Sequence, residues 1–278
     1  MTKSLADPPS AVRPWGRVLP PLPASRRRPL HVVERNVLAY RRMWFIFLTG
    51  FAEPMLYLMS IGVGVGALVG RLPGPGGRPV TYEAFVAPGL LAAAAMNGSV
   101  FDTTFNFFVK YKYAGTYDAM LATPLRPGDV ALGEVGWALL RGTVYAAAFL
   151  VTMAALGLVQ SGWAVLGVPA AVLIGYAFAG LGLATTTWMR SFVDFDFVNL
   201  ALVPMFLFSA TFFPLSRYPS GVAWVVRVTP LYQGVSLVRG LVLGDIHWTL
   251  LVHVAYLAAL GWGGLHVASV RLARLLQP

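Results

Sequence analysis

Six long apolar stretches restrict the fold of this chain more than any other feature of its sequence. Each is close to or longer than the roughly 17–25 residues that an α-helix needs to cross the hydrocarbon core of a bilayer. The fifth is the shortest, with one proline inside it and another directly after it. The pattern predicts an all-α integral membrane protein with six transmembrane helices. The predicted spans are 44–69, 85–109, 135–159, 163–189, 197–213 and 250–270.

Composition supports this fold class and excludes several others. Hydrophobic residues make up 57% of the 278 residues and charged residues only 12%, whereas an average globular chain has about 25% charged residues. So few charges cannot cover the surface of a soluble particle, and most of the apolar surface must face lipid or other membrane helices. The chain has no cysteine, which excludes disulfides, thiolate metal sites and cysteine nucleophiles.

The basic residues predict how the chain is oriented. Lys and Arg exceed Asp and Glu by 21 to 11, and basic residues that flank membrane spans favour the cytoplasmic side. With the N-terminus inside, 15 basic residues fall in cytoplasmic segments and five in outer segments. We therefore expect a multi-pass protein of the inner (cytoplasmic) membrane with both termini in the cytoplasm, contacting membrane lipids and no nucleic acid.

Two regions precede the first span. Residues 1–29 contain seven prolines and a run of three arginines without an apolar core, so they predict a disordered cytoplasmic arm rather than a signal peptide. From Leu30 to Met43, apolar residues recur at helical spacing between charged ones. This favours an amphipathic elbow helix in the membrane interface; the alternative is a cytoplasmic extension of the first span. The transmembrane domain is predicted to cover 30–278.

The chain lacks the motifs of the common nucleotide and metal sites. A P-loop requires a lysine directly after a glycine, and none of Lys3, Lys110 and Lys112 follows one. The four histidines show no metal-ligand spacing, and no hydrolase constellation is present. We therefore expect a protein that is not an enzyme and binds no cofactor itself.

Three charged residues fall inside predicted spans and need a partner, a cavity or a shallow position. Glu53 precedes Pro54 and is expected at a bend, while Asn106 follows Asp102 by four residues and shares its helix face. Two interpretations stay open. Glu53, Asp102 and Arg141 form a substrate-pathway or gating set, or Arg141 extends to the cytoplasmic interface and pairs with one carboxylate. A proton relay is a further alternative, although no chain of carboxylates crosses the membrane.

The inner loop near 111–134 carries the most informative motif. Glycine, proline and aspartate residues break up its helical runs, which predicts short helices at the cytoplasmic face. A helix at Thr116–Leu121 would present Tyr117, Met120 and Leu121 together as an exposed apolar patch. Such a patch favours a docking site for a cytoplasmic partner.

This loop resembles the coupling helix of ABC-2 type exporter permeases, which meets the ATPase in that family. The matching positions are Gly115, Thr116, Ala119, Met120, Leu121, Thr123, Pro124, Leu125, Asp129, Gly133 and Glu134. The stretch from Glu53-Pro54 and Tyr57 to Gly66 is similar to the first span of nodulation lipo-oligosaccharide exporter permeases, where the acid is more often Asp. Residues 208–215, with Pro219, Pro230-Leu231 and Arg239, resemble the tail of daunorubicin-type drug exporters, although Ala210-Thr211 stands where glycine is usual.

The resemblance implies the transmembrane subunit of an ATP-driven exporter. It implies a dimer with itself or a related permease, two separate ATPase subunits that carry ATP and Mg²⁺, and short outer re-entrant helices between spans five and six. The substrate would be a hydrophobic drug, a lipid or a lipid-linked saccharide; a proton-coupled secondary transporter without an ATPase is the alternative function. The residues expected to couple to the ATPase are Gly115, Thr116, Tyr117, Met120, Leu121, Thr123, Pro124 and Leu125. The pathway or gating candidates are Glu53, Tyr57, Phe101, Asp102, Phe105, Asn106, Arg141, Phe206 and Phe212.

Overall fold

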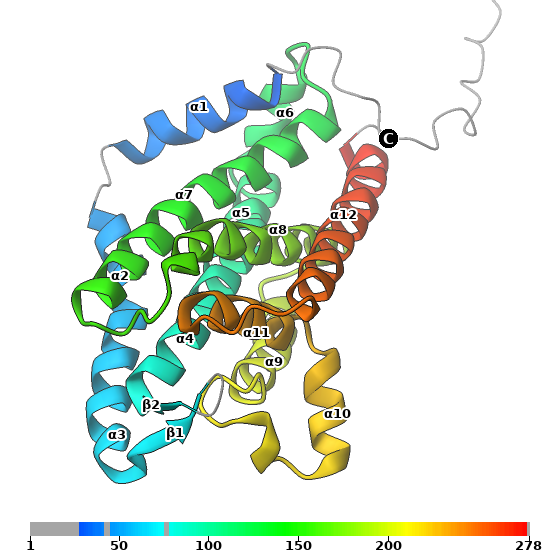
Figure 1. Ribbon diagram of the computed structural model, residues 1–278. Helices are drawn as coiled ribbons and strands as arrows, with labels where there is room; N and C mark the ends of the chain where they lie inside the picture. The colour runs from blue at the N-terminus through cyan, green and yellow to red at the C-terminus, as the bar shows by residue number, and fades with distance from the viewer. Residues whose placement is uncertain (1–27, 42–44, 75–77, 277–278) are drawn as a thin grey trace, which may run out of the picture.

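The computed structural model describes residues 28–41, 45–74 and 78–276, and within them the chain forms a bundle of helices with one small hairpin (Figure 1). The α-helices are α1 (Arg28–Tyr40), α2 (Phe45–Tyr57), α3 (Gly64–Val69), α4 (Tyr82–Phe101), α5 (Phe107–Lys112), α6 (Thr116–Leu121), α7 (Pro127–Ala155), α8 (Gly167–Thr186), α9 (Asp194–Leu207), α10 (Ser220–Val228), α11 (Pro230–Leu243) and α12 (Thr249–Leu276). Strands β1 (Arg71–Pro73) and β2 (Pro79–Thr81) pair antiparallel. The hairpin was not predicted from the sequence. Of the predicted disordered arm, 1–27 lies outside the described residues, and its last two residues begin α1.

Five helical segments in the described part of the chain are long and apolar enough to cross a membrane. They are Ala52–Val69, Tyr82–Lys112, Pro127–Ala155, Gly162–Thr186 and Thr249–Leu275, and they coincide with predicted spans one, two, three, four and six. The helices α2 and α3 are joined by π-helical residues Leu58–Val63, and α4 and α5 by π-helical residues Asp102–Asn106. The first two spans are therefore continuous helical segments.

The fifth predicted span differs from the structure. Helix α9 has 14 residues and ends at Leu207, which gives a length of about 21 Å, less than the roughly 30 Å hydrocarbon core. The following residues leave the helix, and Ala210 has a φ of 57°. This left-handed conformation favours glycine. It occurs at the position where the similar tail of the drug exporters usually has a glycine.

The third span begins earlier than the sequence predicts. Pro127 is the first residue of α7, and the side chain of Asp129 accepts a hydrogen bond from the backbone N–H of Arg126 at 3.1 Å. Proline is favoured at the first helical position, and an acidic residue in the first turn stabilises the start of a helix. Pro127 and Asp129 therefore mark the beginning of α7 and do not interrupt helices within the loop.

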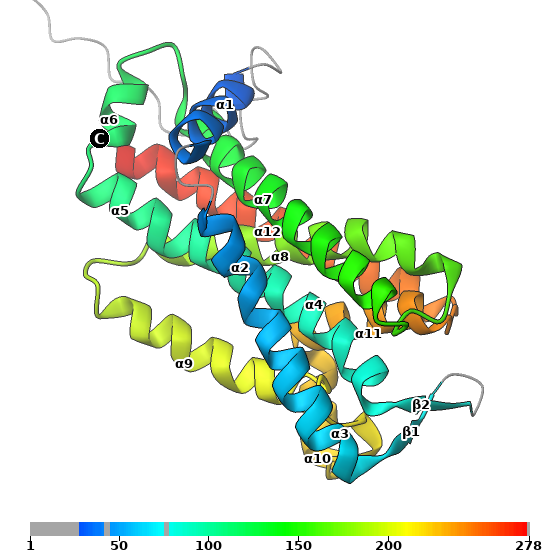
Figure 2. The ribbon, with the colours of Figure 1, turned by 90° about the vertical axis from the view of Figure 1, so that its left-hand side faces the viewer.

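The two ends of the molecule carry different segments. In Figures 1 and 2, α1, α6 and the C-terminal end of α12 lie at one end, and the hairpin, α3 and α10 lie at the opposite end. This arrangement agrees with the predicted alternation of loops along the chain. The segment between α9 and α12 forms the two short helices α10 and α11, and their re-entrant position in the membrane stays a prediction.

Helix α8 lies at the centre of the bundle, where it packs against α4, α7, α11 and α12. Its contact with α12 depends on glycines that face each other. A Cβ atom added at Gly264 would come within 2.8 Å of the backbone of Gly180, whereas one added at the neighbouring Gly263 would meet no atom within 4 Å. Small residues let membrane helices approach closely and gain van der Waals contact.

Helix α1 packs across the N-terminal part of α7, and its inward face is formed by Val32 and Asn36, each 1% exposed. A Cβ atom at Gly133 of α7 would lie 2.9 Å from the carbonyl oxygen of Pro29, so this glycine allows the close crossing. A helix is therefore present where the sequence predicts one, and its position in the membrane interface stays a prediction. Its apolar residues Leu30 and Val37 are exposed rather than packed on the bundle.

Arg239 of α11 fixes the irregular segment after α9. Its guanidinium donates hydrogen bonds to the carbonyl oxygens of Phe85, Ala210 and Thr211 at 3.1, 2.9 and 3.2 Å. The same group lies 3.9 Å from the centre of the Phe85 ring. Two of these bonds satisfy backbone carbonyl groups of the irregular segment, which explains the position of an arginine in α11.

Candidate functional site

A cavity of about 600 Å³ lies between α2, α4, α7 and α9, at the level where the first two spans become π-helical. Figure 2 shows α2 crossing in front of α4, with α9 on one side of them. Six of the nine residues predicted for the pathway line this one cavity: Glu53, Tyr57, Phe101, Phe105, Arg141 and Phe206. These six residues, which were predicted separately along the chain, therefore lie around one cavity, and they come from α2, from the α4 segment with its π-helical turn, from α7 and from α9.

The other three predicted residues lie beside the cavity. Phe212 is 8% exposed and packs edge-on against Phe206, with ring centroids 5.1 Å apart. Asp102 is buried behind Arg141, and Asn106 hydrogen-bonds to Asp102. These three residues support lining residues but do not line the cavity themselves.

Aromatic rings form much of the wall. Phe101 and Phe105 are stacked, with centroids 5.1 Å apart, and Tyr57 contacts Phe206 edge-on at 5.9 Å. Phe101 and Phe105 are 51% and 37% exposed, so their surfaces are accessible. Aromatic pairs of this geometry contribute about 0.5–1.5 kcal/mol beyond the burial of their area, and their free faces are suited to apolar or cationic groups.

Glu53 is the acidic residue of the cavity wall. It lies one residue before Pro54 in α2, as the sequence indicates, and its side chain is exposed. Within the part of the chain that the structure describes, it makes no hydrogen bond and no ion pair. The neutral polar groups of the wall include the amides of Asn97 and Asn199.

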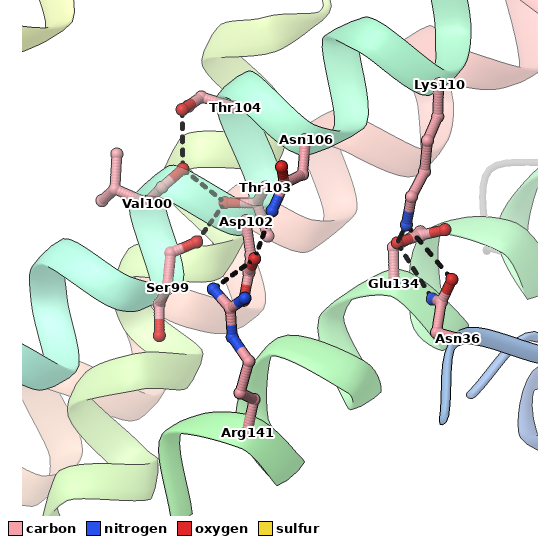
Figure 3. A network of polar contacts seen from close by, with 10 residues as sticks. All are labelled: Asn36, Ser99, Val100, Asp102, Thr103, Thr104, Asn106, Lys110, Glu134 and Arg141. Carbon is pink, nitrogen blue, oxygen red and sulfur yellow. Dashed lines mark hydrogen bonds and ion pairs between the residues drawn. The ribbon is translucent and has the colours of Figure 1, made fainter. Parts of the chain in front are cut away.

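The two remaining intramembrane charges neutralise each other (Figure 3). A guanidinium nitrogen of Arg141 lies 2.6 Å from Oδ1 of Asp102, and the amide of Asn106 donates to the same oxygen at 2.6 Å. The side chains of the pair are only 8% and 4% exposed. The expectation that Arg141 pairs with a carboxylate is confirmed, but the expectation that it extends to the membrane interface is wrong. The partner lies one helix away, so the arginine stays within the bundle.

The described residues contain two π-helical turns, one in the first span and one in the second, and both adjoin the cavity. The turn at Leu58–Val63 directly follows Tyr57, and the turn at Asp102–Asn106 contains the paired carboxylate and Phe105. Such turns widen the helix by one residue and occur frequently at functional sites. Thr103 and Thr104 donate to carbonyl oxygens one turn earlier, at 2.7 and 2.6 Å, which satisfies carbonyl groups of the irregular turn.

A second polar cluster joins the second and third spans, as the Asp102–Arg141 pair does, but nearer the α6 end of the molecule (Figure 3). Lys110 of α5 lies 2.6 Å from Oε2 of Glu134 in α7, and the amide of Asn36 in α1 donates to that oxygen at 3.2 Å. Glu134 is 3% exposed. Glu134 was expected only as part of the family motif, and its pairing with Lys110 was not predicted. The polar Asn36 among the apolar positions of α1 was the available signal.

Helix α6 spans Thr116–Leu121, as predicted, but its expected exposed patch does not exist. Tyr117 and Met120 are 1% and 8% exposed and pack into the bundle, where the ring of Tyr117 lies 4.8 Å from that of Phe107. Burial, together with the nearby Glu134 carboxylate, raises the pKa of the Tyr117 phenol well above its ordinary value. Periodicity identified the residues that share a face, but that face meets the bundle instead of solvent.

The exposed side of this region is short and mildly polar. It consists of Asp118 and Ala119 of α6 and the turn residues Ala122, Thr123 and Pro124 that follow. Leu121 and Leu125 are partly buried against the same core as Tyr117. Gly115 precedes the helix with a φ of 56°, a left-handed conformation that glycine adopts without strain.

A chain of aromatic contacts connects the cavity with the residues before α6. Phe105 in the cavity wall contacts Phe192 of the α8–α9 loop at 6.0 Å, and Phe192 stacks on Tyr113 at 5.1 Å. Phe195 contacts Phe105 and Phe108 at 5.5 and 5.4 Å. Phe192 and Phe195 were not predicted. Phe192 lies in a loop and Phe195 at the start of α9, where no periodic pattern distinguishes them.

The described residues contain no group of three or more His, Asp or Glu side chains placed to hold a metal ion. What the arrangement provides is an aromatic cavity whose acid, Glu53, has no partner among the described residues, beside helices that are joined by two largely buried ion pairs. These features describe a helical membrane protein with a partly open, aromatic-lined cavity between its helices.

Comparison with known proteins identifies the family. A family model described as ABC-2 type transporter matches residues 30–243, and the chain belongs to this family of membrane permeases. It is 30% identical to Nodulation protein J of Rhizobium meliloti (strain 1021) over 266 residues, 95% of this chain and 100% of that protein. It is 35% identical over 225 residues to Nodulation protein J of Rhizobium leguminosarum bv. trifolii, 80% of this chain and 84% of that protein. The resemblance stated from the sequence motifs is confirmed.

Proposed function

We propose that this chain is the permease subunit of an ATP-driven exporter that moves a hydrophobic or amphiphilic substrate outward across the cytoplasmic membrane. The observation that carries the proposal is the aromatic cavity, which a chain of ring contacts connects to Tyr113, three residues before α6. Family membership supports it, since ABC-2 permeases generally work with an ABC ATPase. The active complex would contain two permeases, identical or related, and two ATPase subunits that bind ATP and Mg²⁺.

The proposed topology has six spans with both termini in the cytoplasm. Helix α9 and the irregular residues after it would complete the fifth crossing, and α10 and α11 would re-enter from the outer side. The side chains of α9 support a lipid or subunit contact, since Phe197 and Leu200 are 68% and 69% exposed. Irregular backbone at membrane depth is tolerated where its polar groups are satisfied inside the protein, and the bonds of Arg239 satisfy two such carbonyl groups.

In the proposed mechanism, α6 transmits the motion of the ATPase. Its outer side contacts the ATPase, while Tyr117 and Met120 anchor its inner side in the bundle. Displacement of α6 would therefore move the bundle rather than bend a free loop. Lys110–Glu134 and Asp102–Arg141 join the second span to the third, so these spans would move together. Alternating access then needs two stable packings of the helices and no chemistry in the permease.

The test uses the exposed side of α6, because Tyr117 and Met120 are buried in the bundle. An Ala119→Arg variant places a long cation on the exposed side, while the buried anchor stays intact. The matched control is Ala273→Arg, which introduces the same side chain at an exposed position near the end of α12. Both variants should insert and purify as the native chain does. Only Ala119→Arg should lose the co-purifying P-loop ATPase and ATP-dependent transport.

Two results would contradict the proposal. Transport that continues after ATP depletion and collapses with the proton gradient would support a secondary transporter instead. Retention of the ATPase and of full coupling by the Ala119→Arg variant would remove α6 from the mechanism.

A further inference from the structure

The charges around the cavity do not balance. The cavity wall includes Arg141 and Glu53. Arg141 is neutralised by Asp102 at 2.6 Å, inside the bundle and behind the wall. Glu53 has no such partner among the described residues, and its side chain is exposed. The cavity therefore presents one uncompensated negative charge to any molecule that enters it.

The position of this charge next to aromatic rings adds a second feature. Tyr57 follows Glu53 by four residues in α2, so the carboxylate and the ring lie on the same face of the helix. Tyr57 contacts Phe206 from the opposite wall, and Phe101 and Phe105 form a stacked pair in the same cavity. Aromatic faces attract ammonium-type cations within about 6 Å of the ring centroid, and this attraction grows as water is excluded.

We propose that the cavity selects amphiphiles with a cationic headgroup, and that Glu53 determines this selectivity. The carboxylate would pair with a quaternary ammonium, phosphonium or protonated amine, and the aromatic wall would hold the apolar part of the molecule. An anionic amphiphile of the same size would meet the Glu53 carboxylate, and the one basic residue among the described lining residues, Arg141, is already paired. The inference deepens the proposed export function and rests on it for its biological meaning, but the binding preference itself is a property of the isolated permease.

Two ions of nearly the same size and shape and opposite charge make the test direct: tetraphenylphosphonium and tetraphenylborate. Saturable binding of each is measured on the purified full-length chain in detergent, with no ATPase and no ATP. The two ions partition differently into micelles, so each ion is compared across protein variants rather than with the other ion. The native chain should bind tetraphenylphosphonium saturably.

The test variant is Glu53→Gln, which removes the charge, keeps the shape and breaks no hydrogen bond in the described structure. It should weaken tetraphenylphosphonium binding about tenfold or more, a change of about 1.4 kcal/mol, without weakening tetraphenylborate binding. Glu53→Lys should reverse the preference and create tetraphenylborate binding. The control is Asp245→Asn, which removes one negative charge from an exposed site outside the cavity. This control should bind both ions as the native chain does.

The proposal is overturned if the native chain shows no saturable tetraphenylphosphonium binding, or if Glu53→Gln and the native chain bind it equally well. It is also overturned if Asp245→Asn weakens binding as much as Glu53→Gln. These outcomes are separate from a failure of the export function, because association with the ATPase is measured independently. A Glu53→Gln variant that keeps its ATPase but loses the cation would leave the exporter intact and confirm the selectivity.

Discussion

The buried ion pair between Asp102 and Arg141 allows a quantitative prediction. The pair is 2.6 Å long, and both side chains are less than a tenth exposed. Removing one member leaves an uncompensated buried charge, which costs about 3–5 kcal/mol. For a domain of about 150–250 residues, 1 kcal/mol corresponds to about 2–4 °C in Tm. Asp102→Asn and Arg141→Gln should therefore each lower the apparent Tm by about 6–20 °C.

The double variant distinguishes a true pair from two separately important residues. When both charges are removed, neither is left unpaired, so the double variant should lose less stability than the sum of the two single losses, by about 1–3 kcal/mol. Thermal unfolding of the detergent-solubilised protein, scanned at one fixed rate for all variants, provides the comparison. Asp245→Asn serves as the control, since it removes an exposed carboxylate beside His247 and should change Tm by only a few degrees. Additive losses, or single losses no larger than that of the control, would refute the coupling.

Three further predictions concern the packing of helices at two glycines and the backbone contacts of Arg239, and each uses the same unfolding assay. Gly264→Ala should destabilise the chain by about 1–3 kcal/mol, because its Cβ would clash with the backbone of α8. The control Gly263→Ala should be neutral or slightly stabilising. Equal effects of the two substitutions would contradict the close helix contact. Gly133→Ala should destabilise by a similar amount by displacing α1, whereas Gly142→Ala, with no neighbour within 4 Å, should not. Arg239→Gln should cost about 3–5 kcal/mol, because it removes three bonds to backbone carbonyls; an unchanged Tm would show that water replaces them.

Much of the architecture follows from length and periodicity. Apolar runs of membrane length located five spans, and the short helix Thr116–Leu121 was predicted with the bounds that the structure shows. Helix α1 was also expected from its apolar periodicity, whereas the two short helices α10 and α11 were expected only from the resemblance to the family. The spans, α1 and α6 depend on local sequence, which is why one chain without its relatives is sufficient to predict them.

Features that depend on tertiary distance were harder to predict. Three intramembrane charges could be identified from the sequence, but only the structure shows that Arg141 pairs with Asp102, while Glu53 has no partner among the residues that the structure describes. Similarly, helical spacing groups Tyr117 with Met120, yet it does not reveal that they face the bundle. The end of α9 was missed because its apolar run continues beyond Leu207, where the backbone turns instead of extending the helix.

The contact between α6 and an ATPase is the central claim, and the absence of cysteine from the chain makes it directly measurable. A single cysteine introduced by Ala119→Cys is coupled to a maleimide photocrosslinker in native membranes, and adducts are identified by mass spectrometry. The control, Ala154→Cys, is exposed near the opposite end of α7. A crosslink from position 119 to a P-loop ATPase, absent from position 154, is the predicted result. No ATPase adduct at 119, or an equal adduct at 154, would contradict the account.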